Sequence, residues 1–145
     1  MITNLSYDCD VLIIGAGPAG CTAATILAEE KGRKVIVLEK EHFPRYHVGE
    51  SLIPHCWDTL NRLGMTERLD EKGFQVKQSV QFVDPEGELS TPFYFSKHTD
   101  HPRAKTWQVD RETFDTMMME RAREAGAQVR EGIKVLDFKE QESVV

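Results

Sequence analysis

The feature that most constrains the fold is a glycine-rich segment, residues 15–20 (GAGPAG), which directly follows an apolar run. That run, Tyr7 to Ile14, is rich in β-branched and aliphatic residues, which is typical of a strand buried on both faces of a parallel sheet. The segment from Ala19 to Lys31 has the composition of a helix, and Lys34 to Glu39 reads as a second strand. Short connections in this order predict a right-handed βαβ unit.

The three glycines of this segment have separate tasks. Gly15 permits a tight turn, Gly17 lets backbone approach a diphosphate, and Gly20 lets the helix pack closely on the sheet. The diphosphate is then expected at the helix N-terminus, beside Pro18 and Ala19, where unpaired N–H groups and the helix dipole favour negative charge. The pattern therefore predicts a dinucleotide site.

An acidic residue completes this pattern. Glu39 ends the second strand nineteen residues after Gly20, where its carboxylate can accept hydrogen bonds from a ribose diol and would repel a 2′-phosphate. Lys40, the next residue, is included among the expected binding residues. A glycine-rich turn without a ligand is the alternative, but strand, helix, second strand and terminal acid occur together here.

Composition and charge argue against several other classes of protein. The 145 residues are 40% hydrophobic and 29% charged, as in a globular domain. The 18 Lys and Arg residues are scattered and the net charge is −6, so nucleic acid is not an expected partner. The uncharged run from Val11 to Ala28 is broken by glycines and preceded by acids, which argues against a membrane span. Three cysteines without metal-type spacing indicate reduced thiols, no metal site and a cytoplasmic location.

Beyond Glu39 the alternation of strand and helix is interrupted. Helices are predicted from Pro54 to Leu63 and from Thr66 to Lys72. Residues 75–83 and 88–95 are expected to pair as a β-hairpin through Pro85, Glu86 and Gly87. We assign residues 74–105, this hairpin and the loop after it, to the substrate side.

The last third of the chain returns to the first pattern. A short strand is expected over residues 104–109, and Asp110 then suits the N-cap of an amphipathic helix. Its apolar face is predicted to contain Phe114, Met117, Met118, Ala122 and Ala125. Residues 128–135 and 136–139 read as one or two further strands. The sequence thus predicts an α/β, Rossmann-like domain over residues 1–145, and the lack of a closing helix or polar tail suggests that a C-terminal remainder is missing.

Two further segments resemble one superfamily. Residues 43–54 (FPRYHVGESLIP) resemble the loop of flavin-dependent halogenases and their geranylgeranyl-reductase-like relatives. Residues 107–115 (WQVDRETFD) resemble the second conserved segment that these enzymes share with FAD-dependent aromatic hydroxylases. With the glycine turn, three separated motifs occur in the expected order over nearly the whole chain. The chain is therefore similar to the N-terminal, FAD-binding part of such an enzyme.

The resemblance implies FAD as cofactor and assigns roles to individual residues. By this likeness Glu39 holds the adenosine ribose, and Arg111 reaches the FAD phosphate or ribityl region. Arg111 is permanently charged, and a cation at a helix N-terminus is unfavourable without an anion nearby. The residues that approach the flavin are Arg45, Val48, Gly49, Glu50 and Ser51.

Lys77 resembles in its placement the lysine with which halogenases capture or position hypohalous acid. In such enzymes reduced FAD, oxygen and halide give hypohalous acid, which Lys77 would relay to a small organic substrate. Reduced flavin would come from a partner reductase or from NAD(P)H. A solvated lysine on the wet face of a strand is the alternative for Lys77. A flavin-dependent reductase or hydroxylase of the same superfamily, or a non-catalytic FAD-binding fragment, are the alternative functions.

Overall fold

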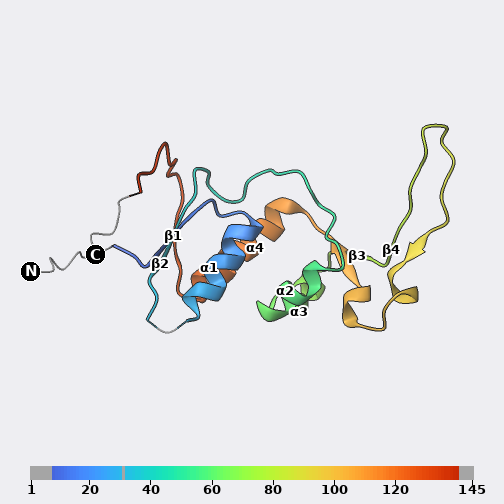
Figure 1. Cartoon of the computed structure of the whole chain (residues 1–145), viewed down its shortest axis with the longest axis horizontal. Helices are drawn as coiled ribbons and strands as arrows, with labels where there is room; N and C mark the ends of the chain where they lie inside the picture. Colours follow the sequence, from blue (N-terminus) through green and yellow to red (C-terminus); the bar gives the residue numbers. More distant parts are fainter. Residues whose placement is uncertain (1–7, 31, 141–145) are drawn as a thin grey trace, which may run out of the picture. The chain divides into compact units, whose positions relative to one another are not determined.

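The computed structural model describes residues 8–30 and 32–140. The chain divides into two compact units. The first unit contains the described residues up to Tyr46 and those from Glu112 onward, and the second unit contains His47 to Arg111. Each unit has its own sheet or sheets and its own helices (Figure 1).

The first unit is built on a parallel sheet of three strands. β1 (Val11–Ile14) and β7 (Gln128–Arg130) flank β2 (Val35–Leu38), and both pairings are parallel. α1 (Pro18–Ala28) connects β1 to β2 and packs on both. The predicted βαβ start and Rossmann-like α/β class are thereby confirmed.

The strands of this sheet differ in burial. Val35, Ile36 and Val37 of the central strand are at most 3% exposed, whereas Leu12 and Ile14 of β1 are 53% and 58% exposed. Burial of the first strand on both faces was therefore a wrong prediction. β1 alternates between half-buried and exposed positions because, among the described residues, only one of its faces is covered. Tyr7, the predicted start of the strand, lies outside the described residues.

α4 (Arg111–Glu124) supplies an apolar stripe to the first unit. Phe114, Met118 and Ala122, spaced four residues apart, are buried as predicted. Met119 is buried in place of Met117, which is only half-buried. The stripe is thus turned towards the side that also carries Asp115, a carboxylate with no exposed surface.

The end of the described chain departs from its predicted strands. β7 stops at Arg130, and residues 131–140 form no regular helix or strand. Backbone contact with the loop after β2 continues, because Ile133 donates to the Glu39 carbonyl at 2.8 Å. Leu136 and Phe138 are 84% and 79% exposed, so the predicted strand over 136–139 has no partner among the described residues.

The second unit contains two short helices and two small antiparallel sheets. α2 (Cys56–Arg62) and α3 (Met65–Lys72) pack together, with Leu60, Leu63 and Leu69 buried. β3 (Gln75–Lys77) pairs with β6 (Thr106–Gln108), and β4 (Ser79–Val80) pairs with β5 (Phe93–Tyr94). One-turn 3-10 helices, η1 (Phe95–Lys97) and η2 (Pro102–Ala104), occupy parts of the expected loop.

The predicted hairpin over residues 75–95 is therefore only partly correct. Its outer part forms through β4, β5 and a bridge between Val83 and Leu89. Its first residues, β3, leave the hairpin and pair with β6 instead. The physical reason lies in burial, since Val76 is opposite Trp107, which is 1% exposed and anchors β6 in the core of the unit.

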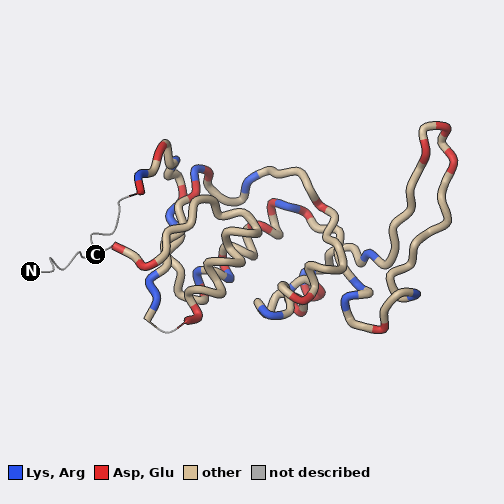
Figure 2. Tube along the Cα trace, in the orientation of Figure 1, with Lys and Arg blue, Asp and Glu red and all other residues tan. Residues whose placement is uncertain are grey.

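Basic and acidic residues are interspersed along most of the described chain, whereas the excursion between β4 and β5 carries acidic residues only (Figure 2). Among the described residues, no helix has both the length and the apolar character needed to cross a bilayer. In the same part of the chain, no cluster of three or more His, Cys, Asp or Glu side chains is arranged to hold a metal ion.

Candidate functional site

The glycine turn joins β1 to α1 in the first unit. Gly15 has φ of +100°, a left-handed conformation that side-chain-bearing residues rarely adopt. A Cβ at Gly20 would lie 2.0 Å from the Gly15 carbonyl oxygen, so helix and turn are in contact there. A Cβ at Gly17 would lie 3.7 Å from Arg45 Nη2, its nearest neighbour. The turn is thus closed by packing at Gly20, whereas nothing lies within 4 Å of a Cβ at Gly15 and only Arg45 lies within 4 Å of one at Gly17.

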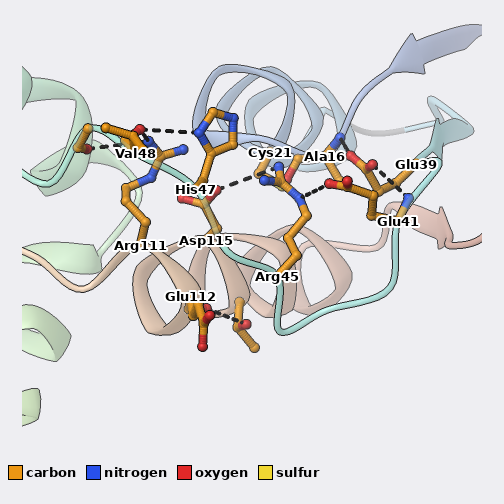
Figure 3. Close-up of polar contacts among 12 residues, drawn as sticks. Ala16, Cys21, Glu39, Glu41, Arg45, His47, Val48, Arg111, Glu112 and Asp115 are labelled. Atoms are coloured by element: carbon orange, nitrogen blue, oxygen red, sulfur yellow. Dashed lines mark hydrogen bonds and ion pairs between the residues drawn. The ribbon is translucent and has the colours of Figure 1, made fainter.

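Glu39 faces this turn and is 4% exposed (Figure 3). Its Oε2 accepts a hydrogen bond from the Ala16 amide at 2.7 Å, and its Oε1 accepts one from the Glu41 amide at 3.0 Å. Burial by itself raises the pKa of Glu39, but these amides and the charge of Arg45 outweigh it and lower the pKa below its ordinary value of 4.5. The carboxylate is therefore ionised, and each oxygen retains a lone pair for a ribose hydroxyl.

Arg45 lies beside the same turn with only 10% of its side chain exposed. Its Nη2 is 3.6 Å from Asp115 Oδ2, its Nε is 3.5 Å from Glu41 Oε2, and its guanidinium lies 4.8 Å from the Phe43 ring centroid. Nε and Nη1 are buried and donate no hydrogen bond. A buried positive charge with unused donors next to a glycine turn fits an anionic group such as a diphosphate, and this differs from the approach to the flavin that the resemblance implied for Arg45.

Cys21 belongs to the same buried cluster (Figure 3). Its thiol donates to the Ala16 carbonyl at 3.1 Å. Burial and, next, the charge of Asp115 raise the pKa of Cys21 to about 12. Cys21 is therefore a neutral packing residue and has no nucleophilic role.

Asp115 is a site residue that the sequence analysis did not single out. It lies within the WQVDRETFD motif, but it was included there only as part of the pattern. The available signal was an acid among the apolar positions of the α4 stripe, next to Phe114 and four residues before Met119. A carboxylate on the buried face of a helix needs a partner, and Arg45 is one.

In the second unit, Arg111 is bound to the loop that resembles the flavin loop. Its Nη1 donates to the Val48 carbonyl at 2.8 Å and lies 3.3 Å from the Gly49 carbonyl (Figure 3). Gly49 has φ of +108°, and a Cβ there would lie 3.1 Å from Arg111 Nη1. A positive charge at the N-terminus of α4 is unfavourable, and the carbonyls of Val48 and Gly49 offset part of that cost for Arg111. Arg111 therefore depends less on a nearby anion than the sequence suggested.

The continuation of this loop runs along β6. Val109 donates to the Glu50 carbonyl at 2.8 Å, Leu52 donates to the Trp107 carbonyl at 3.0 Å, and Ser51 forms an antiparallel bridge with Gln108. Residues 50–52 therefore act as a short extra strand. The loop is held by backbone pairing and by Arg111.

Lys77 contacts this loop. Its Nζ donates to Ser51 Oγ at 2.5 Å and lies 6.0 Å from the Phe95 ring centroid. Lys77 is half-buried and hydrogen-bonded, which disfavours the alternative of a fully solvated strand lysine. Lys40, by contrast, has a 63% exposed side chain whose Nζ is 4.0 Å from Glu41 Oε1. It belongs neither to the buried residues beside the glycine turn nor to the contacts around the loop of the second unit.

Comparisons with known proteins agree with these features. The family model described as tryptophan halogenase matches residues 10–105. A flavin-dependent halogenase, armH3, from Armillaria mellea is 38% identical over 93% of this chain and 26% of its own length. The 1H-pyrrole-2-carbonyl-[peptidyl-carrier protein] brominase of Pseudoalteromonas luteoviolacea is 39% identical over 88% of this chain and 29% of its own length.

Solved structures give the same result. The myxobacterial chondrochloren halogenase CndH superposes with a TM-score of 0.78 at 36% identity, over 86% of this chain and 28% of that one. The chain thus spans between a quarter and a third of the length of these relatives. The predicted resemblance is confirmed, and the chain belongs to the tryptophan halogenase family, of whose members it matches the N-terminal region.

Proposed function

We propose that this chain is the FAD-binding part of a flavin-dependent halogenase. Relatives named as flavin-dependent halogenases align over about nine tenths of it. The observation that carries the proposal is the hydrogen bond from Lys77 Nζ to Ser51 Oγ. It connects the lysine that would hold hypohalous acid to the loop that resembles the flavin loop of these enzymes.

In the first unit, we assign the adenosine diphosphate part of FAD to the glycine turn and Glu39. Gly17 leaves the turn accessible, and the first amides of α1 offer donors to the diphosphate. The ionised Glu39 carboxylate accepts hydrogen bonds from the ribose, as its lowered pKa favours. Arg45 supplies positive charge beside the turn, which offsets the repulsion between Glu39 and the diphosphate.

In the second unit, we assign contact with the flavin end of the cofactor to residues 48–51. Gly49 carries no side chain, so backbone can lie against a flat ring. Arg111 fixes the carbonyls of Val48 and Gly49, and pairing with β6 fixes Glu50 and Ser51. A loop held in this way loses little conformational entropy when a ligand binds.

The chemistry of the whole enzyme follows from the family. When bound and reduced, FAD would supply the two electrons that, with halide and protons, convert oxygen to hypohalous acid and water. Lys77 holds the oxidant by a hydrogen bond from its ammonium group and directs it to the substrate. The substrate is a small organic molecule, either free or, as the name of the brominase relative indicates for that protein, attached to a carrier protein. A partner reductase or NAD(P)H supplies the reduced flavin.

The proposal is tested by Lys77→Ala in the flavin-loaded protein, supplied with reduced flavin, oxygen and either chloride or bromide. We expect halide-dependent product to be lost while the yellow flavin absorbance is retained. Lys97→Ala is the matched control, because Lys97 is another lysine of the second unit and contacts Tyr94 rather than the loop. In the unsubstituted protein, product that forms without halide would indicate a reductase or hydroxylase, and bound flavin without turnover would indicate a binding module. Either outcome, or full halogenation by Lys77→Ala, contradicts the proposal.

A further inference from the structure

We propose that Ser51 is a positioning residue that fixes the ammonium group of Lys77. The inference rests on the proposed function for its catalytic meaning, but the contact itself is a property of the second unit alone. It gives Ser51 a task other than the flavin contact expected from the sequence.

The strand register explains why these two side chains meet. Lys77 is opposite Thr106, and Ser51 is opposite Gln108 on the other edge of β6. Thr106 and Gln108 are two residues apart, so all four side chains project from the same face of the strands. Trp107 and Val76 project from the opposite face, towards the core of the unit. Lys77 therefore reaches Ser51 across β6, over two inter-strand spacings of roughly 5 Å each.

Two contacts restrain the lysine at the end of this reach. Ser51 Oγ accepts its hydrogen bond at 2.5 Å, and the ring of Phe95, which is 6% exposed, lies 6.0 Å from Nζ. Phe95 is itself held by backbone hydrogen bonding to Gln78 at 3.0 Å. A flexible four-carbon side chain thereby acquires a defined end point.

A hydroxyl is well suited to this task. An ammonium group has three donors, and the hydrogen bond to Ser51 uses one of them. A carboxylate in the same place would neutralise the charge and bind the ammonium more strongly. Ser51 fixes the position of Nζ and leaves both its charge and two donors for an oxidant. We therefore expect removal of the hydroxyl to loosen Lys77 without disturbing the fold.

The contact is tested by nuclear magnetic resonance of the lysine ammonium groups in the 145-residue chain at mildly acidic pH. The Lys77 signal is assigned by its absence in Lys77→Arg. In Ser51→Ala we expect its protons to exchange with water at least about tenfold faster, as the loss of one hydrogen bond to a charged group implies. Ser51→Thr, which keeps a hydroxyl, should restore slow exchange. Ser90→Ala is the control, because the Ser90 hydroxyl accepts from Phe82 N instead.

Activity then tests the meaning of the contact. In the flavin-loaded protein, Ser51→Ala should lower kcat for halogenation several-fold and raise the share of hypohalous acid caught by an added trap. Ser51→Thr, which keeps the hydroxyl, should recover most of kcat. An unchanged Lys77 signal in Ser51→Ala, or unchanged kcat and oxidant release, overturns the inference. If Lys77→Ala itself still halogenates, the proposed function fails, while the exchange measurement separately decides whether the contact exists.

Discussion

The first unit buries the charged groups of its candidate site, whereas the second unit leaves them at the surface. Glu39 and Asp115 are 4% and 0% exposed, and Arg45 is nine-tenths buried between carboxylates. Glu50 and Ser51 are exposed, and Lys77 is half-buried. The buried charges are coupled to folding, because a buried charge must keep its partners. We expect the exposed groups to affect ligand binding and catalysis more than folding.

This difference makes a general prediction about mutations. Changes in the first unit should alter stability and cofactor affinity together, because the same contacts serve both. Changes around the loop of the second unit should alter function while leaving the free energy of unfolding nearly constant. The predictions below compare the two units in this respect.

The largest effect is expected for Gly20→Ala. A Cβ 2.0 Å from the Gly15 carbonyl oxygen forces α1 away from the turn. We expect a loss of about 3 kcal/mol in the free energy of unfolding, the upper range for overpacking, together with loss of FAD binding. Gly17→Ala is the control, because its Cβ meets nothing closer than 3.7 Å, so FAD affinity should fall while stability changes little. Urea denaturation and flavin fluorescence titration measure both, and equal stability loss in the two variants would contradict the geometry.

Glu39→Gln should have the next largest effect. The folded-state pKa of Glu39 is lowered, so its ionised form stabilises the fold above its ordinary pKa of 4.5, and this contribution is lost as the pH falls through the folded-state value. Near neutral pH the free energy of unfolding should fall by about 1–3 kcal/mol, because the NH₂ group of the glutamine cannot accept a hydrogen bond and either the Ala16 or the Glu41 amide loses its acceptor. Its stability should also depend less on pH in the acid range. Glu30→Gln, at an exposed surface pair, is the control, and a wild-type acid dependence in Glu39→Gln would contradict the assignment.

Asp70 tests the stability of the second unit away from the loop, at an exposed carboxylate that has a buried partner. Hydrogen bonding to Lys105 is the main cause that lowers the pKa of Asp70, and the buried indole of Trp107 donates to the same carboxylate at 2.9 Å. Asp70→Ala leaves the indole N–H without this acceptor and should cost about 1–2 kcal/mol. Asp70→Asn keeps an acceptor and should cost less than about 1 kcal/mol, as exposed ion pairs do. Tryptophan fluorescence during urea denaturation separates the two, and equal losses would show that the indole contact is unimportant.

The sequence predicted those parts of the fold that depend on neighbouring residues. The βαβ unit followed from an apolar run, spaced glycines and a terminal acid, and each of these signals spans fewer than about 25 residues. The fold class and the family resemblance were confirmed for this reason. The end of the chain was mispredicted because residues 131–140 have the composition of strands but lack a partner strand in the described structure.

Contacts between distant segments were not predictable in the same way. The hairpin prediction failed over β3 because its partner, β6, lies some thirty residues further along the chain, beyond the range of hairpin signals. The Lys77 to Ser51 hydrogen bond depends on the pairing of β3 with β6 in place of residues 88–95. The Arg45 to Asp115 pair depends on α4 presenting an acid on its buried face. These cases show that residue types can suggest a site, whereas its internal geometry needs the tertiary pairing.

The smallest effect is expected for Lys40→Ala. Lys40 and Arg45 both follow β2 and both carry positive charge, but the Lys40 side chain is 63% exposed and its ion pair with Glu41 spans 4.0 Å. Such a pair contributes less than about 0.5 kcal/mol, so stability should be unchanged within error and FAD affinity should change less than about twofold. Arg45→Lys, which keeps the charge but lacks the planar guanidinium, should weaken FAD binding about tenfold because a buried planar donor set is not replaced by a point charge. Flavin titration of both variants at low and high salt provides the measurement. A larger loss of FAD affinity for Lys40→Ala than for Arg45→Lys would mean that the exposed charge of Lys40 matters more for cofactor binding than the buried guanidinium of Arg45.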